Sequence, residues 1–217
     1  MKKQRWRISF SKTEAMRYTG HLDLILAWER TFRRSGLPLS YSEGYSPRPV
    51  INLAAPLPLG YTSCGELGDF WLSEIVSEAY FENSLRKALP PGLDLNHCTE
   101  VPDLHGDKLP NLVQSAAYSI RIADQKTDLT PQVRKLLARQ QIIRTRKGKT
   151  YDLRPLIIDL AVALSPEPGW ITLETTLKLL PGATGRPDEL LRELGIKVHK
   201  SHICRDKIFL KDFSSAQ

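Results

Sequence analysis

The segment RWRISFSK, residues 5–12, decides how the first part of the chain folds. Its large apolar side chains, Trp6, Ile8 and Phe10, occupy every second position, with arginine and serine between them. Neighbouring side chains of a strand point to opposite faces, so this alternation predicts a half-buried β-strand.

The next regular segment, residues 20–35, has helical spacing instead. Its inner face is apolar and consists of Leu24, Ile25, Trp28 and Phe32. Gly36 and Pro38 follow, and a glycine and then a proline after such a run predict the end of a helix.

The remaining elements of the first half complete a known order. Short apolar runs predict strands over 50–54, 65–74 and 93–101. Ser77 is predicted to cap a helix that ends before Pro90. The resulting order, β-α-β-β-α-β, is that of the ferredoxin-like unit.

The second half repeats this order of elements with negligible sequence identity to the first. Its predicted strands cover 116–123, 156–164, 169–180 and 197–211, and its predicted helices follow Thr130 and span 185–195. The strand over 156–164 is nearly continuously apolar, which predicts burial on both faces or a central position in the sheet.

We therefore predict an α+β protein made of tandem ferredoxin-like units. The first unit spans residues 1–103 and the second spans residues 116–217. Residues 104–115 contain proline, glycine and alternating charges, with few apolar side chains, and this composition predicts a linker.

The composition is that of a folded protein without a membrane helix or a disulfide framework. Of 217 residues, 41% are hydrophobic and 25% are charged. Arg5 and Arg7 interrupt the N-terminal segment, so we expect no signal peptide and a cytoplasmic protein. The three cysteines, Cys64, Cys98 and Cys204, are far apart and predict reduced thiols, with no bound metal and no cofactor.

The formal net charge of +7 lies entirely in the second half. Residues 1–105 contain 12 Lys/Arg and 12 Asp/Glu, whereas residues 106–217 contain 19 Lys/Arg and 12 Asp/Glu. Such asymmetry indicates a polyanionic partner, although basic proteins without nucleic-acid partners are common.

The loop YSEGYSPRP, residues 41–49, is the first candidate binding element. Pro47 and Pro49 restrict the backbone around Arg48, so this arginine is held extended for a phosphate or carboxylate. Tyr41 and Tyr45 are candidates for stacking on bases.

The helix before this loop is predicted to form a wall of the same site with its basic residues Arg30, Arg33 and Arg34. The alternative is structural. Arg48 would then pair with Glu43 or Asp23, and the two tyrosines would pack beneath the loop.

The second candidate is RTRKGKT, residues 144–150. Its central Lys-Gly predicts the tip of a β-hairpin. An exposed basic hairpin suits a sugar–phosphate backbone, and a solvated loop is the alternative. The predicted contacts are the cations Arg144, Arg146, Lys147 and Lys149, with Arg154 nearby.

The chain contains no nucleotide-binding, hydrolase or zinc-protease motif. His21 and Asp23, at the start of the first helix, are alternative acid–base residues. His202 and Cys204 would share a strand face, but we interpret the nearby histidines as surface residues and predict no metal site.

Five blocks carry a resemblance: GHLDL (20–24), ERTFRRSGLPL (29–39), YSEGYSPRP (41–49), PLPLG (56–60) and KGKTYDLRPLI (147–157). They resemble a bacterial family known as radical-SAM-linked proteins, a domain of unknown function. The family domain is fused to a cobalamin-binding radical-SAM module or encoded separately near one. This chain resembles the separate form and lacks the CxxxCxxC cluster motif, so the resemblance implies a partner or substrate-presenting role.

Together these features favour a non-catalytic RNA-binding protein that holds tRNA or rRNA for a radical-SAM modification enzyme acting in trans. Two alternatives stay open. One is a metal-independent RNA-processing or RNA-modifying enzyme that uses His21 and Asp23. The other is a protein–protein adaptor whose 41–49 loop docks on the radical-SAM partner.

Overall fold

The computed structural model describes residues 2–123, 128–163, 165, 167–180 and 182–211. The chain divides into two compact units, residues 1–113 and 114–217. Both are mixed α+β units with few helices, and every strand pairing of described register is antiparallel. None of the helices in the described ranges has the length and apolar character needed to cross a membrane.

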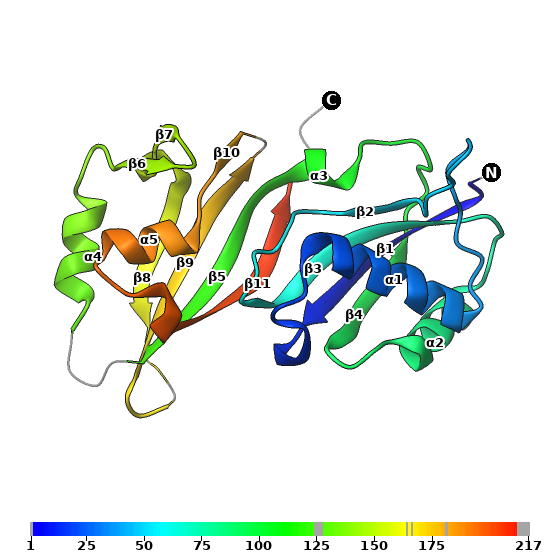
Figure 1. Cartoon of the computed structure of the whole chain (residues 1–217), viewed down its shortest axis with the longest axis horizontal. Helices are drawn as coiled ribbons and strands as arrows, with labels where there is room; N and C mark the ends of the chain where they lie inside the picture. Colours follow the sequence, from blue (N-terminus) through cyan, green and yellow to red (C-terminus); the bar gives the residue numbers. More distant parts are fainter. Residues whose placement is uncertain (1, 124–127, 164, 166, 181, 212–217) are drawn as a thin grey trace. The chain divides into compact units, whose positions relative to one another are not determined.

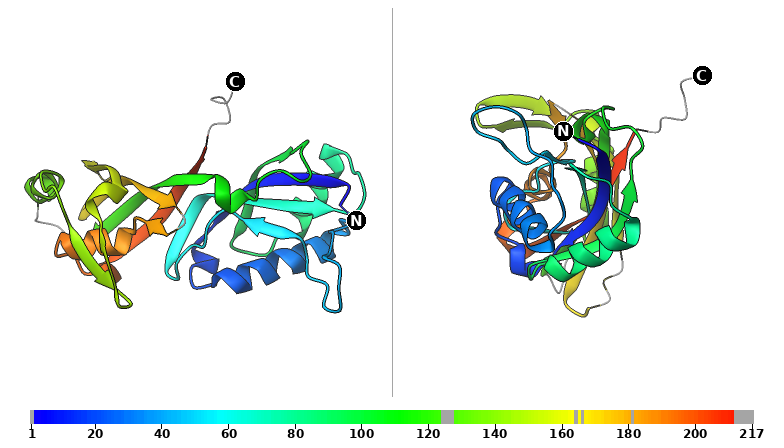
Figure 2. Two further views of the ribbon diagram at one scale, coloured as in Figure 1. Left: turned by 90° about the horizontal axis from the view of Figure 1, so that it is seen from above. Right: turned by 90° about the vertical axis from the view of Figure 1, so that its right-hand side faces the viewer.

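The first unit has the element order that the sequence predicts. After β1 come a 3₁₀ turn and α1, then two strands, α2 and a last strand (Figure 1): β1 (Gln4–Lys12), η1 (Glu14–Met16), α1 (His21–Ser35), β2 (Ile51–Leu53), β3 (Tyr61–Leu72), α2 (Glu78–Ala88) and β4 (Leu93–Glu100). Along the sheet the strand order is β2-β3-β1-β4. Figure 2 shows α1 lying along one face of this sheet.

The predicted helix signals are confirmed. Gly36 ends α1 with a positive φ of 72°, a conformation that costs glycine little because it has no Cβ. The Ser77 hydroxyl accepts a hydrogen bond from the Tyr80 backbone N–H and so caps α2.

Aromatic rings fill the space between the sheet and the two helices. Trp6 of β1 stacks on Phe81 of α2 with ring centroids 4.3 Å apart, and Phe32 of α1 stacks on Phe70 of β3 at 4.9 Å. All four side chains are buried. The alternating apolar face of 5–12 is thus the floor of this core, as its spacing predicts.

The opposite face of β1 carries a buried ion-pair cluster. Arg5 donates from Nη2 to the Asp69 carboxylate at 2.6 Å, and Arg7 donates from Nε to the same carboxylate at 2.8 Å. Asp69 is fully buried and Arg5 is 2% exposed. Two guanidinium groups therefore share one buried carboxylate across the β1–β3 pair.

Arg5 also fixes the segment that the sequence predicts to be a linker. Its remaining N–H groups donate to the carbonyls of Asp103 and Asp107, and its guanidinium lies 4.9 Å from the Trp71 ring centroid. Residues 104–115 are not a plain connection, because they contain α3 (Leu109–Leu112) and the start of the next strand.

The second unit begins with a strand and a helix, followed by a hairpin: β5 (Val113–Ala123), α4 (Thr130–Leu137), β6 (Ile143–Arg146) and β7 (Lys149–Asp152). Further elements complete it: η2 (Arg154–Leu156), β8 (Ile157–Ala163), β9 (Trp170–Leu180), β10 (Ala183–Thr184), α5 (Pro187–Glu193), η3 (Val198–Lys200) and β11 (Ser201–Leu210). β9 pairs with β5, β8 and β10, and β11 lies beside β5.

The core of the second unit comes from one face of its sheet and from α4 and α5. Leu173 and Leu177 of β9 and Leu190 of α5 are fully buried there. The prediction that the strand over 156–164 is buried on both faces or central is wrong, because Ile158 of β8 is 54% exposed and, among the described strands, β8 pairs with β9 alone. This strand has apolar residues on both faces, but only one face packs against the core. Its composition therefore does not show which face is exposed.

We expect Asp69→Ala to lower the free energy of unfolding by about 3–5 kcal/mol, because it leaves the buried Arg5 without its counter-charge. Urea denaturation followed by tryptophan fluorescence measures this change. Glu82→Ala is the matched control, because it removes a carboxylate from the solvent-exposed pair with Arg86 and should cost less than about 1 kcal/mol. Equal losses for the two variants would contradict the structural role of Asp69.

Candidate nucleic-acid interface

The loop of residues 41–49 is fixed at its base and open at its tip. At the base, Ser40 N–H donates to the Trp71 carbonyl at 2.7 Å, and Val50 N–H donates to the Ser40 carbonyl at 2.8 Å. Farther out, Ser42 N–H donates to the Arg48 carbonyl, and Arg48 N–H donates to the Ser42 hydroxyl. The backbone around Arg48 is therefore tied down on both sides.

The side chains of this loop face solvent. Tyr45 is fully exposed and Tyr41 is 42% exposed, so neither ring packs beneath the loop. The Arg48 side chain makes no hydrogen bond or ion pair within the described part of the chain, and this excludes the internal pairs with Glu43 and Asp23 considered above. The loop presents a cation, Arg48, and two exposed aromatic rings on a fixed backbone.

The three arginines of α1 differ in their polar partners. Arg33 pairs with Glu29 at 3.0 Å, one helical turn away. Arg34 donates to the Ala88 carbonyl at 2.7 Å and so satisfies the C-terminal end of α2. Arg30 is exposed and has no polar partner among the residues that the structure describes.

A hollow of about 460 Å³ lies where α1 and α2 end. Its lining consists of Arg34, Ser35, Ser84, Lys87 and Ala88. The cations there also complement the negative ends of the two helix dipoles, so their position has a structural explanation.

The predicted hairpin is confirmed. β6 and β7 pair antiparallel, with Arg146 opposite Lys149. The two turn residues, Lys147 and Gly148, have φ values of 49° and 76°. Positive φ at both central positions is the geometry of a type I′ turn, which matches the twist of a two-stranded ribbon.

The hairpin arginines are held by α5. Arg144 donates from Nε to Glu189 and from Nη1 to Glu193, both at 3.0 Å, and Arg146 lies 4.0 Å from Glu189. Glu189 is only 3% exposed. Burial lowers the pKa of Arg144, but the hydrogen bonds and charges of Glu189 and Glu193 outweigh it, and the pKa rises above its ordinary value.

This ion-pair network extends along α5. Arg139 pairs with Glu193, Arg186 pairs with Asp188, and Arg192 pairs with both Asp188 and Glu189. Each carboxylate therefore meets at least two guanidinium groups, and arginine outnumbers acid in the network. The hairpin is anchored through charge and not through apolar packing alone.

Tyr151 of β7 lies close enough to the carboxylates of this network to be affected by their charge. Its hydroxyl is buried and has no hydrogen-bond partner among the described residues. Burial, followed by the charges of Glu189 and Asp188, raises the pKa of Tyr151 above its ordinary value, so the phenol stays neutral.

Arg154 is also a structural side chain. Its Nε donates to the carbonyls of Leu137 and Arg139 at 3.2 Å, which satisfies the end of α4. By contrast, Lys147 and Lys149 are exposed, and neither has a polar side-chain partner in the described ranges. Of the predicted cations of this region, the two lysines are the ones most available to a ligand.

The alternative catalytic residues do not converge. His21 is half-buried at the first position of α1, and Asp23 is exposed two residues later. Side chains two residues apart on a helix do not face each other. The structure thus does not bring these two groups together for acid–base work.

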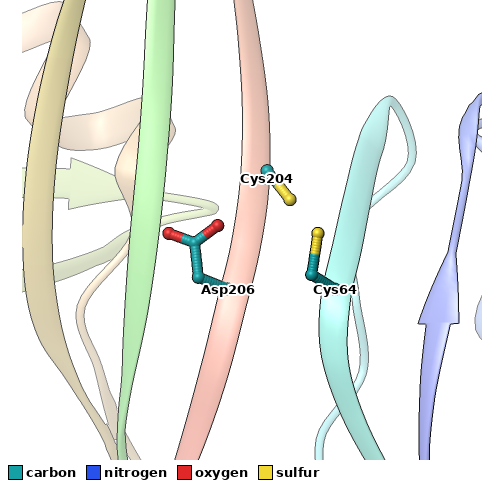
Figure 3. Close-up of side chains that lie close together, drawn as sticks. All are labelled: Cys64, Cys204 and Asp206. Carbon is teal, nitrogen blue, oxygen red and sulfur yellow. The ribbon is translucent and has the colours of Figure 1, made fainter. Parts of the chain in front are cut away.

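His202 and Cys204 both lie on β11. The His202 ring packs edge-on against Trp170 with centroids 5.5 Å apart. Cys204 and Asp206 lie two residues apart on β11 (Figure 3), and the Asp206 carboxylate accepts a hydrogen bond from Ser119 of β5 at 2.6 Å.

The remaining cysteines differ in exposure. Cys64 of β3 is exposed, whereas Cys98 of β4 is buried. Burial, with smaller contributions from Glu82 and Glu78, raises the pKa of Cys98 to about 11. Cys98 is therefore a protonated core thiol at neutral pH.

The acidic half of the network was not predicted from the sequence. Asp188, Glu189 and Glu193 lie within the stretch PDELLRE of α5, and the hairpin arginines lie more than 40 residues earlier. Acidic residues in the first turn of a helix are ordinary, so no local signal marks them as partners of the hairpin.

Residues 5–187 match the model of a protein family described as an uncharacterized protein conserved in bacteria (DUF2344). The chain belongs to this family. The matched range contains the 41–49 loop, the hairpin and the first residue of α5. No curated protein matches the chain.

Within the hairpin, we expect Arg144→Met to lower the free energy of unfolding by about 1–3 kcal/mol, because it removes two charge-assisted hydrogen bonds from partly buried carboxylates. Lys149→Met, on the same hairpin, should change it by less than about 0.5 kcal/mol. Thermal and urea unfolding measure both values. Similar losses for both variants would contradict the division into anchoring arginines and free lysines.

Proposed function

We propose that this protein is a non-catalytic RNA-binding accessory protein that holds tRNA or rRNA for a radical-SAM modification enzyme acting in trans. One observation carries the proposal most strongly. The β6–β7 hairpin exposes Lys147 and Lys149 at its tip, while ion pairs from Arg144 and Arg146 to the buried Glu189 fix its first strand, β6.

This arrangement suits a sugar–phosphate backbone. Lysine ammonium groups act as mobile point charges, which fit phosphates without a fixed orientation. Binding releases condensed counterions and therefore depends on salt. The unit adds exposed cations on and just after α4, namely Arg134, Lys135 and Arg139, although Arg139 is paired with Glu193.

The 41–49 loop supports contact with unpaired bases. Tyr41 and Tyr45 offer exposed rings, and base stacking on aromatic side chains is a common mode of single-strand recognition. Arg48 offers a planar donor fork with no internal partner in the described chain. Because the backbone is already fixed, less freedom is lost on binding.

We further propose that both units have the ferredoxin-like arrangement. The strand order β2-β3-β1-β4 of the first unit has a counterpart in the order β8-β9-β5-β11 of the second, with the hairpin inserted between α4 and β8. This is support at the level of topology, and the radical-SAM partnership rests on the sequence resemblance.

Lys147→Ala/Lys149→Ala should weaken binding to unfractionated bacterial tRNA and rRNA. The slope of log K against log salt should fall by roughly 0.7–0.9 for each lost phosphate contact. Filter binding across a range of salt concentrations measures the slope.

The matched control is Lys197→Ala/Lys200→Ala, which removes two exposed cations of the same unit away from the hairpin. Affinity and slope unchanged in the hairpin variant would contradict the proposal. Cleavage or modification of the RNA by the isolated wild-type chain would favour an enzyme instead.

Arg48→Lys tests the loop. It keeps the charge but removes the planar fork, so a bidentate contact should weaken by about 1–3 kcal/mol while the melting temperature stays the same. Isothermal titration with single-stranded RNA and thermal unfolding measure the two quantities. A lower melting temperature with unchanged RNA affinity would make Arg48 a structural residue.

A further inference from the structure

The hollow where α1 and α2 end contains hydrogen-bond donors that its structural contacts leave unused. Its lining has two cations and two serines, and none of the described residues that line it is a carboxylate. Its volume of about 460 Å³ lies in the range of small-molecule sites. The dipoles of α1 and α2 explain why cations lie there, but they do not explain the space and the donors beside them.

Arg34 is held in place and still has donors to offer. Its Nη2 donates to the Ala88 carbonyl at 2.7 Å and to the Thr31 hydroxyl at 3.3 Å. Its Nε and Nη1 make no hydrogen bond to any residue that the structure describes. A guanidinium that is already oriented loses little freedom when it binds a ligand.

α2 supplies the facing donors. Ser84 and Lys87 are three residues apart, so they lie on the same side of the helix. Neither side chain has a hydrogen bond or ion pair within the described ranges. Ser35 differs, because its hydroxyl already donates to the Phe32 carbonyl at 2.8 Å. The unused donors therefore come from Arg34 on one helix and from Ser84 and Lys87 on the other.

The carboxylates of α2 face away from the hollow. Helical period places Glu78 and Glu82 on the side of α2 opposite Lys87. Both carboxylates act instead on the Cys98 thiol of β4, whose pKa their charges raise. Glu82 also pairs with Arg86 at 2.6 Å.

The carboxylates of α1 do not neutralise the hollow either. Glu29 pairs with Arg33 at 3.0 Å. Asp23 shares the side of Arg34 but lies 11 residues earlier, which is about 16 Å along the helix and beyond the screening length at physiological salt. Arg30 lies one turn before Arg34 on the same side and has no polar partner in the described chain, so it adds positive charge.

The charge of the hollow stays positive after the helix dipoles are counted. The C-terminus of a helix acts as about half a negative charge, so the two helix ends contribute roughly one. Arg34 and Lys87 contribute two positive charges. We propose that the hollow binds a phosphate monoester, whose dianion presents three acceptor oxygens to donors that come from both helices.

Two sources carry this chemistry. One is a small sugar or polyol phosphate, and the other is the terminal phosphate of an RNA strand. An internal phosphodiester carries only one negative charge and fits the two cations less well. The hollow contains neither of the hairpin lysines, so the proposal goes beyond the proposed function and does not depend on it.

Phosphorus NMR and isothermal titration of the full chain with glycerol phosphate test the site. We expect saturable binding of glycerol phosphate and of inorganic phosphate, and no binding of glycerol. Lys87→Met should weaken the binding about tenfold, the effect of one lost charge-assisted hydrogen bond. Ser84→Ala should weaken it less. The melting temperature of the Lys87 variant should stay the same, because this side chain is exposed.

Two controls accompany these variants. Lys108→Met removes an exposed lysine of the same unit that does not line the hollow, and it should leave phosphate binding unchanged. Lys147→Ala/Lys149→Ala should also leave it unchanged, which separates failure of this site from failure of RNA binding. Single-stranded RNA with and without a terminal phosphate distinguishes the sources, because only the RNA source predicts a preference that Lys87→Met abolishes.

Three outcomes overturn the proposal. One is that the wild-type chain does not bind glycerol phosphate. Another is that Lys87→Met binds it as tightly as the wild type does. The third is that succinate, a dicarboxylate, binds as tightly as glycerol phosphate, because the hollow would then select negative charge and not a phosphate group.

Discussion

The first unit depends on one buried carboxylate. Asp69 of β3 neutralises Arg5 and Arg7 of β1, and Arg5 in turn holds the carbonyls of the segment after β4. Removing ions from water is costly, so a cluster of this kind persists only where each donor finds an acceptor. Trp71, which contacts Arg5, also bonds through its backbone to the base of the 41–49 loop. The cluster thus connects the sheet to the loop that displays Arg48.

In the second unit, a buried carboxylate likewise holds arginines, and here it anchors a hairpin. Buried Glu189 holds the arginines of the β6–β7 hairpin, while the lysines at its tip have no such partner in the described chain. Arginine provides several fixed donors and suits an anchor, whereas lysine provides a mobile charge and suits a ligand that varies. Anchored arginines and free lysines together make a rigid hairpin with an adaptable tip, and the RNA proposal builds on this combination.

Much of the fold follows from the sequence by itself. Alternation of Trp6, Ile8 and Phe10 determined a half-buried strand, and the spacing of Trp28 and Phe32 determined the buried face of α1, because side-chain period is fixed by backbone geometry. Gly36, Ser77 and the Lys-Gly pair at 147–148 act on their own backbone, so their local roles as cap or turn could also be predicted.

Only the tertiary structure decided which charged and apolar groups meet. Arg144 is bound by Glu189, 45 residues away, and the Arg17 guanidinium donates to the Gly60 carbonyl, 43 residues away. No local sequence pattern predicts either pair. Composition could not separate anchored arginines from free lysines, since both contribute equally to net charge. Burial and partner choice depend on how distant segments pack, and this is why the sequence located the basic hairpin and the rigid loop but not the groups that hold them.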